Sequence, residues 1–383
     1  MTYRLRIAFN GTALLSPLTG VGQYAKSLAE SLAATGELEI EYFYAAVWSN
    51  DIRTEPIREI GAIKDLIKKF VPQPYRVSRV LQQWRFGMGA KRLRPQLYHE
   101  PNFLPFNFDG PTVITAHDLS WIRFPETHPG ERVAVMNELF PKALERADHV
   151  LTDAAYVRQE IIDMFGIAPE RITSVPLGAR SIFHTRGEDD CRSVLGKRSL
   201  DYRGYVLCVG TLEPRKNLEL AIRAYVGLPA SFRQRRPLVI VGMKGWLTSG
   251  LESLMQPLVV TGEIRPLGFT SEATLAALYA GALVLVYPSL YEGFGLPPLE
   301  AMASGTPVIV SDRSTLPEVV GPAGVQIAAD DDAGLREALL RFDEDPTFWE
   351  QRAEASLAQA SQFSWERCAR ETLAIYRSVV KTS

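Results

Sequence analysis

The chain has 383 residues, of which 46% are hydrophobic and 22% charged, and its formal net charge is −2 at pH 7. This length fits two doubly wound α/β units, and the near-neutral charge gives no sign of a nucleic-acid partner. Cys191, Cys208 and Cys368 are too scattered for a disulfide framework or a CxxC metal site, which favours a reducing cytoplasm. No apolar run of about 18 residues occurs, so we expect a cytoplasmic protein without a signal peptide or a transmembrane helix.

Strand and helix patterns alternate along the first half of the chain. An apolar strand is predicted at 5–10 and a helix at 22–35, which the following glycine ends. The other elements predicted in this half are strands at 38–47, 112–115, 149–152 and 172–176 and helices at 131–146 and 154–165. This alternation is typical of βαβ units that build a parallel sheet.

A polar, charged segment at 180–203 follows, and we place the interdomain linker there. A second alternating series has predicted strands at 205–210, 237–242, 264–268, 282–287 and 307–311 and helices at 218–227, 272–280 and 297–304. The predicted domains are 1–182 and 200–363, with a C-terminal helix at about 364–381 packing back on the first. The predicted fold class is α/β, with two doubly wound Rossmann-like domains facing a cleft. Because such sheets bind ligands outside the carboxyl ends of their strands, the ligand is expected in that cleft.

The clearest functional signal is a buried strand that leads into a glycine loop and then a proline-initiated helix, at 287–305. Gly293 and Gly295 allow backbone N–H groups to come close to a ligand, and the following helix N-terminus carries partial positive charge. The pattern predicts a diphosphate site. Glu292 and Glu300 are expected to face the same ligand, one near a sugar and one near a ribose. The alternative is a solvated Glu292 and a surface Glu300, although Glu300 lies in an otherwise apolar helix.

A second strand–glycine–helix junction lies at 209–218. Arg215 and Lys216 are adjacent cations immediately before its helix. Fixed cations at such a point stabilise the negative charge that develops on a departing phosphate. A solvated basic turn is the alternative for any Arg-Lys pair, and the neighbouring glycine loop favours the catalytic interpretation.

Two further glycines, Gly20 and Gly22, precede the first predicted helix. They resemble a dinucleotide-binding fingerprint, but ten residues separate Gly20 from the strand end at Asn10, which is too far for a Rossmann fingerprint. We predict instead a mobile loop that reaches across the cleft to phosphates.

His117 follows the predicted strand at 112–115 and precedes Asp118. An imidazole at a strand end can bind a sugar hydroxyl or an acceptor, so His117 is predicted to act in catalysis, and a buried structural His–Asp pair is the alternative. The cluster at 98–102 is a similar strand end with a weaker claim. The remaining histidines are interpreted as structural. They are His128, His149 and His184.

No metal site is predicted. The acidic run at 330–332 fits a helix N-terminal cap and the run at 343–345 fits a turn, and neither follows an apolar strand at the cleft. No cofactor is expected.

Taken together, these motifs resemble those of the family 4 glycosyltransferases, retaining enzymes of the GT-B fold. An E-x7-E pattern matches Glu292 and Glu300, a Gly-x5-Lys-Asn pattern matches Gly210 to Asn217, and the runs at 305–309 and 316–318 are also typical of the family. The similarity is strong over about 150–380 and looser in the first half. In this chain the Gly-x5-Lys-Asn motif reads Gly-Thr-Leu-Glu-Pro-Arg-Lys-Asn, which looks like the same motif in bacterial mannosyltransferases of O-antigen and exopolysaccharide assembly.

The resemblance implies a role for each motif. Glu300 would bind the donor ribose, Glu292 would touch the sugar, and Lys216 would bind the diphosphate. His117 would act from the first domain, and Arg215 would supply the second cation, because many family members have arginine where this chain has threonine after the first motif glycine. The donor-binding residues assigned on this basis are Gly20, Gly22, Thr211, Gly242, Phe269, Gly293, Phe294, Gly295, Leu296 and Glu300.

The implied reaction is transfer of a hexose with retention of the anomeric configuration, without a metal. The leaving phosphate accepts the proton of the acceptor, and no enzymic nucleophile takes part. GDP-mannose is the first choice of donor, with a UDP-sugar or dTDP-rhamnose as the alternative, and the expected acceptor is a glycan or a polyprenyl-linked glycan. A nucleotide-sugar epimerase is the alternative of another class. The displaced glycine loop disfavours a dinucleotide oxidoreductase, and the intact motif residues disfavour a catalytically dead binding module.

Residues 58–96 carry ten Lys and Arg side chains against two acids, a local charge of +8 in a chain of net charge −2. Phe70, Tyr75, Trp84 and Phe86 are interleaved with these cations, and apolar residues recur at helical spacing over 60–70. Such a composition suits the surface of an anionic inner leaflet, so a peripheral location on the cytoplasmic membrane is expected. The alternatives are a solvated basic face whose apolar stripe packs on the first domain, or a patch for an anionic acceptor.

Overall fold

The computed structural model describes residues 4–15, 20–54, 74–242 and 249–382. Contacts divide the chain into two compact units. The first consists of residues 1–119, 131–177 and 365–383, and the second of residues 120–130 and 178–364. Each unit has its own sheet, so the alternating pattern of the sequence produces two α/β units.

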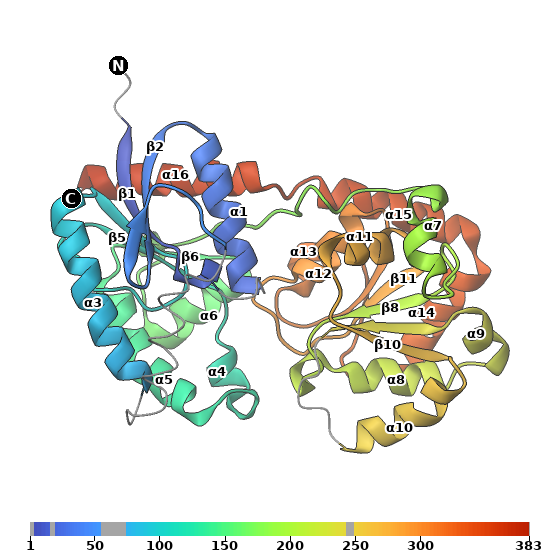
Figure 1. Ribbon diagram of the computed structural model, residues 1–383. Helices are drawn as coiled ribbons and strands as arrows, with labels where there is room; N and C mark the ends of the chain where they lie inside the picture. Colours follow the sequence, from blue (N-terminus) through green and yellow to red (C-terminus); the bar gives the residue numbers. More distant parts are fainter. Residues whose placement is uncertain (1–3, 16–19, 55–73, 243–248, 383) are drawn as a thin grey trace. The chain divides into compact units, whose positions relative to one another are not determined.

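A seven-stranded sheet forms the centre of the first unit (Figure 1). Its strands lie in the order β3-β2-β1-β4-β5-β6-β7, and all neighbours are parallel except β2 and β3. The strands are β1 (Leu5–Asn10), β2 (Leu38–Tyr44), β3 (Val47–Ser49), β4 (Leu97–Glu100), β5 (Thr112–Ala116), β6 (His149–Thr152) and β7 (Ile172–Ser174). The strand order reverses between β1 and β4, and doubly wound sheets bind ligands at such a switch point.

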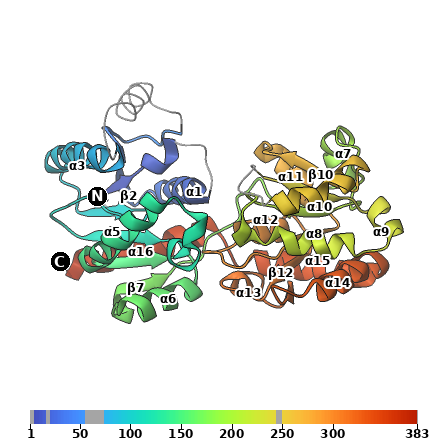
Figure 2. The same cartoon turned by 90° about the horizontal axis from the view of Figure 1, so that it is seen from below.

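Helices cover both faces of this sheet (Figure 1, Figure 2). The helix α1 (Gly20–Ala34) packs against α16 (Trp365–Thr382) on one face. The helices α3 (Pro74–Leu93), α5 (Gly130–Arg146) and α6 (Ala155–Phe165) lie on the other, because right-handed crossovers put helices that lead in opposite directions along the sheet on opposite faces. Tyr376 of α16 is fully buried and its Oη lies 2.6 Å from Nδ1 of His99, so the C-terminal helix is part of the first unit.

Two local features of the first unit differ from prediction. The strand expected at 38–47 ends at Tyr44, because Ala45 adopts a left-handed φ of 59° and the chain turns back into the antiparallel β3. The predicted glycine loop is also wrong, because Gly20 and Gly22 form the first turn of α1, with Gly22 buried. Residues 16–19, which precede this turn, lie outside the described residues.

A six-stranded, wholly parallel sheet forms the centre of the second unit, in the order β10-β9-β8-β11-β12-β13. The strands are β8 (Val206–Val209), β9 (Leu238–Val241), β10 (Ile264–Gly268), β11 (Val284–Tyr287), β12 (Val308–Ser311) and β13 (Val325–Ile327). Strands buried on both faces read as continuous apolar runs, which is how β8, β9 and β11 appear in the sequence.

The second unit contains most of the remaining helices. They are α4 (Ser120–Arg123), α7 (Glu188–Gly196), α8 (Leu218–Val226), α9 (Ala230–Arg235), α10 (Ser249–Val260), α11 (Glu272–Ala280), α12 (Leu296–Ala303), α13 (Leu316–Val320), α14 (Asp332–Glu344) and α15 (Pro346–Ala360). Short 3₁₀ turns occur at Thr12–Leu15, Pro125–Thr127, Pro169–Arg171 and Pro214–Lys216. The segment 180–203 is not a linker as predicted, because it contains α7, whose Cys191 and Leu195 are buried.

Candidate active site

The loop between β11 and α12 is held in place by hydroxyl groups that follow β12. Thr315 Oγ1 donates to the carbonyl of Phe294 over 2.7 Å, and Ser314 Oγ accepts from the amide of Glu292 over 2.9 Å. Gly295 is the N-cap of α12 with a φ of 111°, and a Cβ there would lie 2.9 Å from Cδ2 of Leu316. Both the backbone conformation and the packing therefore require glycine at 295.

Glu292 is buried and binds both cations of the β8–α8 junction. Lys216 Nζ lies 2.6 Å from Glu292 Oε1, and Arg215 Nη1 lies 3.4 Å from Glu292 Oε2. Two hydroxyls complete the carboxylate's shell, since Tyr287 Oη donates over 2.8 Å and Ser289 Oγ over 2.5 Å. The structure thus brings together three of the residues predicted to be catalytic, from two motifs about 75 residues apart.

The electrostatics of this cluster favour the charged forms. Burial would raise the pKa of Glu292, but Lys216 and Arg215 outweigh burial and hold that pKa at about 2. Arg215 is further fixed by Glu213, 2.6 Å away, and by the carbonyl of Tyr291, 2.5 Å away. The side chain of Lys216 is only 17% exposed, so the ammonium is held where solvent screens it little.

Glu300 lies one turn inside α12 and is also buried, so the prediction of a non-surface position is confirmed. Its carboxylate accepts from Nη2 of Arg180 over 3.2 Å and from Tyr279 Oη over 3.3 Å, and Arg180 also pairs with Glu272. Burial raises the pKa of Glu300 to about 7 in spite of these donors. Its role at a ribose stays a prediction.

A cavity of about 1070 Å³ in the second unit is lined by α10, by residues of β9 and β10 and their carboxyl ends, and by Leu212 after β8. Gly242, at the end of β9, approaches the carbonyl of Gly210 so closely that a Cβ at 242 would lie 1.8 Å from that oxygen. Thr211 follows Gly210 and is half-buried, whereas Phe269 follows β10 and is 75% exposed. Among the residues that line the cavity are Leu212, Ile240, Gly242, Met255, Leu267 and Gly268. It is large enough for a nucleoside.

In the first unit, His117 forms a buried pair with Asp153. Its Nδ1 lies 2.8 Å from Asp153 Oδ2, and its Nε2 lies 2.8 Å from the carbonyl oxygen of Pro101. Burial would lower the pKa of His117, but Asp153 outweighs it and the pKa is raised. Nε2 faces a carbonyl oxygen and therefore donates to it, and Nδ1 shares a hydrogen bond with the carboxyl group of Asp153. This is the geometry of the structural alternative, and a contact of His117 with sugar or acceptor stays a prediction.

The strand-end cluster at 98–102 is also internally bonded. Glu100 accepts from Asn10 Nδ2 and from Tyr98 Oη, each over 2.6 Å, and burial raises its pKa to about 7. His99 contacts Tyr376 and Thr115, and burial lowers its pKa to about 3, so the ring is neutral. These residues hold the sheet and α16 together.

The described residues contain no group of three or more His, Cys, Asp or Glu side chains arranged to hold a metal ion. Asp331 caps α14 by accepting the amide of Gly334 over 2.8 Å, and Asp345 caps α15 by accepting the amide of Phe348 over 2.9 Å. The interpretation of the first acidic run as a helix cap is thus confirmed. No helix within the described ranges is long and apolar enough to cross a bilayer.

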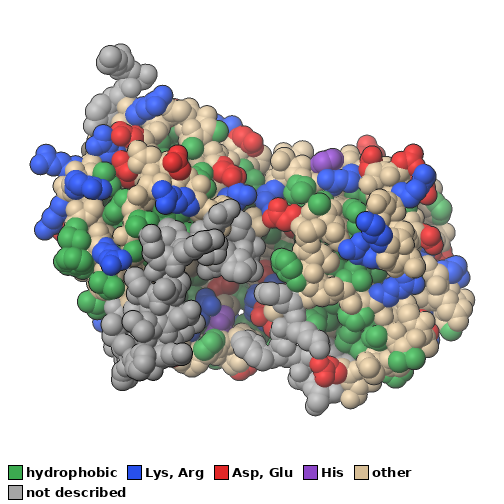
Figure 3. Space-filling view, viewed as in Figure 1, with side chains coloured by type: hydrophobic (Ala, Val, Ile, Leu, Met, Phe, Trp, Pro, Cys, Tyr) green, Lys and Arg blue, Asp and Glu red, His purple; other side chains and the backbone are tan. Residues whose placement is uncertain are grey.

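The basic segment 58–96 is described only in part, because residues 55–73 lie outside the described residues, and with them the predicted stripe at 60–70. On α3, Phe86 is fully buried and Arg79 binds the carbonyls of Leu104 and Pro105, so neither belongs to a surface patch as predicted. The exposed face of α3 does combine apolar and basic side chains (Figure 3). Its exposed members are Val80, Leu81, Trp84, Met88, Lys91 and Arg92.

Several residues of the site were missed by the motif analysis. Tyr287 and Ser289 lie in the β11 motif, and their bonds to Glu292 follow from the sharp turn of that loop. Asp153 follows the last residue of β6, and an acid at a strand end is a signal that could have paired it with His117. Arg180 carries no such signal, because it lies in a polar segment 120 residues from Glu300.

Two α/β units on largely parallel sheets, with cations and a glycine loop at the strand ends of the second, have the architecture of the GT-B class of glycosyltransferases. Solved structures of this class match the whole chain. Sucrose-phosphate synthase from Thermosynechococcus elongatus has a TM-score of 0.76 and 22% identity, covering 99% of this chain and 100% of that one. Anabaena Alr3699/HepE in complex with UDP-glucose has a TM-score of 0.73 and 17% identity, covering 98% and 100%.

Sequence comparison then gives the family. The family model described as Glycosyltransferase Family 4 matches residues 18–180, and that described as Glycosyl transferases group 1 matches residues 197–360. The O-antigen chain mannosyltransferase B of Escherichia coli is 36% identical over 380 residues, which is 97% of this chain and 100% of that protein. The chain belongs to the family 4 glycosyltransferases, and the predicted fold class and enzyme class are confirmed.

Proposed function

We propose that the protein transfers mannose from GDP-mannose, with retention of the anomeric configuration, to a lipid-linked glycan during assembly of an O-antigen-type polysaccharide. The observation that carries the sugar and the process is the full-length likeness to an O-antigen chain mannosyltransferase. The nucleotide-sugar class is supported by the likeness to a structure in complex with UDP-glucose.

The second unit supplies the groups that act on the donor. Lys216 and Arg215 bind the diphosphate, and Lys216 stabilises the charge that grows on it as the sugar departs. Glu292, ionised because its pKa is about 2, keeps Lys216 oriented through the 2.6 Å contact and lies where the sugar binds. When the donor binds, the hydrogen bond from Arg180 to Glu300 is replaced by hydrogen bonds that the ribose hydroxyls donate to the Glu300 carboxylate.

The chemical step exchanges one bond at the anomeric carbon for another on the same face. The bond from this carbon to the phosphate oxygen breaks, the bond to the acceptor oxygen forms, and the acceptor proton passes to the departing phosphate. The ammonium and guanidinium groups of this chain provide the countercharge, so the proposed reaction needs no metal.

The acceptor side of the proposal is supported by α3. Its exposed face carries Trp84, which is 60% exposed, and its last turn carries Lys91 and Arg92. An amphipathic aromatic and flanking cations suit the headgroup region of an anionic leaflet, where a lipid-linked acceptor is presented.

The donor is tested by incubating the protein with labelled GDP-mannose, UDP-glucose or dTDP-rhamnose and an extracted lipid-linked glycan. The proposal expects GDP release from GDP-mannose that depends on acceptor, and an α-linked product by NMR, because the donor is α-linked. Turnover only with another donor refutes the mannose assignment, a β-linked product refutes retention, and an isomerised donor without acceptor indicates an epimerase.

A further inference from the structure

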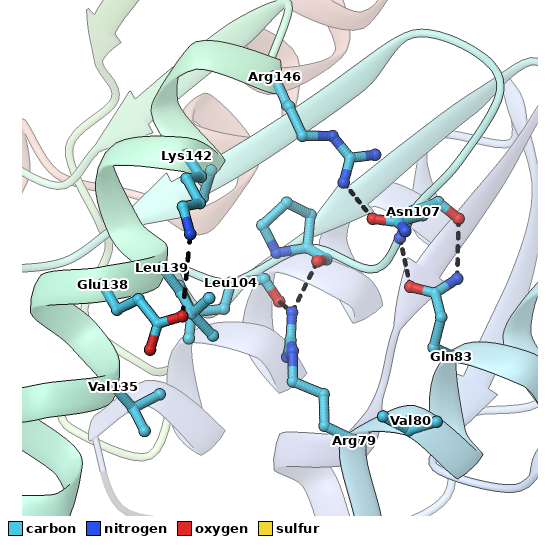
Figure 4. Close-up of a pocket in the computed structure, with 12 residues that line it drawn as sticks. Arg79, Val80, Gln83, Leu104, Asn107, Val135, Glu138, Leu139, Lys142 and Arg146 are labelled. Carbon is cyan, nitrogen blue, oxygen red and sulfur yellow. Dashed lines mark hydrogen bonds and ion pairs between the residues drawn. The ribbon is translucent and has the colours of Figure 1, made fainter. Parts of the chain in front are cut away.

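A cavity of about 470 Å³ lies between α3 and α5 in the first unit (Figure 4). No residue assigned to the donor or to catalysis lines it. Its lining comes from α3, from the loop that follows β4 and from α5, and includes Val80, Leu104, Val135, Leu139, Lys142 and Arg146. This volume lies in the range of pockets that hold small ligands or a part of a larger one.

Apolar side chains form the wall of the cavity. Val135, Leu139 and Ala143 follow one face of α5 at spacings of four, and Leu104 and Pro105 also line the cavity. Arg79 does not make this wall polar, because its Nη2 donates to the carbonyls of Leu104 and Pro105 over 3.1 and 2.7 Å and its guanidinium stacks on Phe106. The interior is therefore suited to a hydrocarbon.

The side-chain amide of Gln83 binds the backbone of Asn107 instead of facing the cavity. Gln83 Nε2 donates to the backbone carbonyl of Asn107 over 3.1 Å, and the backbone N–H of Asn107 donates to Gln83 Oε1 over 2.6 Å (Figure 4). A glycan needs many hydrogen-bond partners, so this arrangement disfavours a sugar as the occupant.

Two cations of α5 stand at the edge of the cavity. Lys142 is 63% exposed and its Nζ lies 3.8 Å from Glu138, a surface pair of small stability, and Arg146 donates to Asn107 Oδ1. Even without Arg79, which binds backbone carbonyls, they outnumber the one acid of the lining, Glu138, by two to one. Charge therefore favours an anionic head group.

The cavity is continuous with the exposed apolar face of α3. Val80 lines the cavity and is 72% exposed, and Trp84 and Met88 follow it at spacings of four, 60% and 48% exposed. An apolar track thus leads from the cavity along a helix whose last turn is basic.

We propose that the α3–α5 cavity is a lipid-binding site that takes a hydrocarbon chain of a phosphate-bearing lipid, with the phosphate on Lys142 and Arg146. This inference rests on the proposed function. A transferase with a lipid-linked acceptor needs a site that docks the enzyme on the membrane in which that acceptor lies. The occupant is a lipid rather than a peptide, because the wall is apolar, the edge is cationic and the Gln83 amide is already bound to the Asn107 backbone.

The test measures binding of monomeric dodecyl phosphate by calorimetry, with inorganic phosphate and dodecyl maltoside as probes that lack the chain or the charge. The proposal expects one dodecyl phosphate per chain and binding at least about tenfold weaker for either control, because several buried methylenes and a charge contact each contribute more than this. Inorganic phosphate that binds as tightly as dodecyl phosphate, or no saturable binding, would overturn it.

Two variants locate the site. Leu139→Trp fills the cavity, and the double change Lys142→Gln with Arg146→Gln removes its edge charge. Each should weaken dodecyl phosphate binding at least about tenfold, whereas Met164→Trp and Lys197→Gln, on exposed positions elsewhere, should not. Unchanged binding in both site variants refutes the proposal. Binding of GDP by the second unit is measured in parallel, so a failed donor assignment is distinguished from a failed lipid site.

Discussion

Glu292 and Glu300 lie eight residues apart in the chain, are both buried, and have opposite electrostatic surroundings. Two cations hold the pKa of Glu292 at about 2, whereas burial raises the pKa of Glu300 to about 7 although Arg180 is near. Environments that separate the pKa values of two carboxyl groups give them different roles. Glu292 is therefore ionised at neutral pH and orients Lys216, whereas the carboxyl group of Glu300 titrates near neutral pH.

Lys216→Ala should lower kcat about 10²-fold or more with a smaller effect on donor affinity, because the ammonium matters most as negative charge grows on the phosphate. Steady-state kinetics with a fixed acceptor measure both constants. Lys197→Ala, on the exposed end of α7, is the control and should change neither. A Lys216→Ala enzyme that keeps most of its kcat would show that another group carries the developing charge.

Glu300→Gln should become more stable relative to the wild type as pH rises. A carboxyl whose folded pKa of about 7 exceeds its ordinary 4.5 contributes stability that is fully present below pH 4.5 and is lost as pH rises through 7. The loss is on the order of 3 kcal/mol, and an amide does not undergo it. Thermal unfolding at pH 5 and pH 8 measures the change, with Glu344→Gln on the surface of α14 as control. A difference in Tm that is equal at both pH values would contradict the buried, raised carboxyl.

At the scale of elements, the active site is a set of junctions between strands and helices. The β8 and β11 junctions each end a buried strand, turn sharply and begin a helix, and β8 and β11 are neighbours in the sheet. Adjacent parallel strands place their carboxyl ends together, which is why Lys216 meets Glu292. The β9 junction joins them through the close approach of Gly242 to Gly210.

Gly242→Ala should therefore disturb the site without touching a charged group. The new Cβ would lie 1.8 Å from the Gly210 oxygen, so the ends of β8 and β9 must separate, at a cost of about 1–3 kcal/mol. We expect a lower Tm and weaker binding of GDP by calorimetry. Gly250→Ala, where a Cβ meets nothing within 4 Å, is the matched control. If the Gly242→Ala variant binds GDP with normal affinity, the β9 junction takes no part in donor binding.

At the scale of the whole molecule, the chain divides its tasks between units. The second holds the cations and the glycine loop to which the proposed function assigns the donor, and the first carries α3, the proposed lipid-binding site between α3 and α5, and the His117–Asp153 pair. The C-terminal helix α16 belongs to the first unit, so the chain crosses between the units more than once.

The complete enzyme should turn over in excess EDTA, because Lys216, Arg215 and the N-terminus of α12 provide the countercharge to the diphosphate. Initial rates with and without chelator should agree. In a further sample, Mg²⁺ or Mn²⁺ is added in excess over EDTA, and the rate is measured again. Activity that disappears in EDTA and returns with either ion would refute metal-independent transfer.

The protein should bind phosphatidylglycerol vesicles and not phosphatidylcholine vesicles, and binding should weaken as salt rises, because each surface cation contributes about 1 kcal/mol and is screened. Co-sedimentation measures it. Trp84→Ser should reduce binding, whereas Met164→Ser on α6 should not. Equal binding to both vesicle types would refute the electrostatic attraction to anionic lipid. No binding to anionic vesicles at low salt would refute the peripheral membrane location.

The features that depend on neighbours along the chain could be predicted from the amino-acid sequence. Alternating strands and helices predict two α/β units, and the strand–glycine–helix junctions predict Glu292, Lys216 and the loop at 293–296, because short-range backbone geometry dictates glycine, proline and apolar positions there. The charge of segment 58–96 is likewise a property of composition.

The contacts between residues far apart in the chain could not be predicted and were found in the folded chain. Arg180 reaches Glu300 across 120 residues, Asp153 reaches His117 across 36, and Tyr376 reaches His99 across 277. Folding also turned Arg79 and Phe86 inward, formed α7 within the predicted linker and opened the cavity between α3 and α5. Such contacts depend on which helix and sheet faces pack against one another. The sequence pattern of one element does not identify the residues of the other element that it contacts.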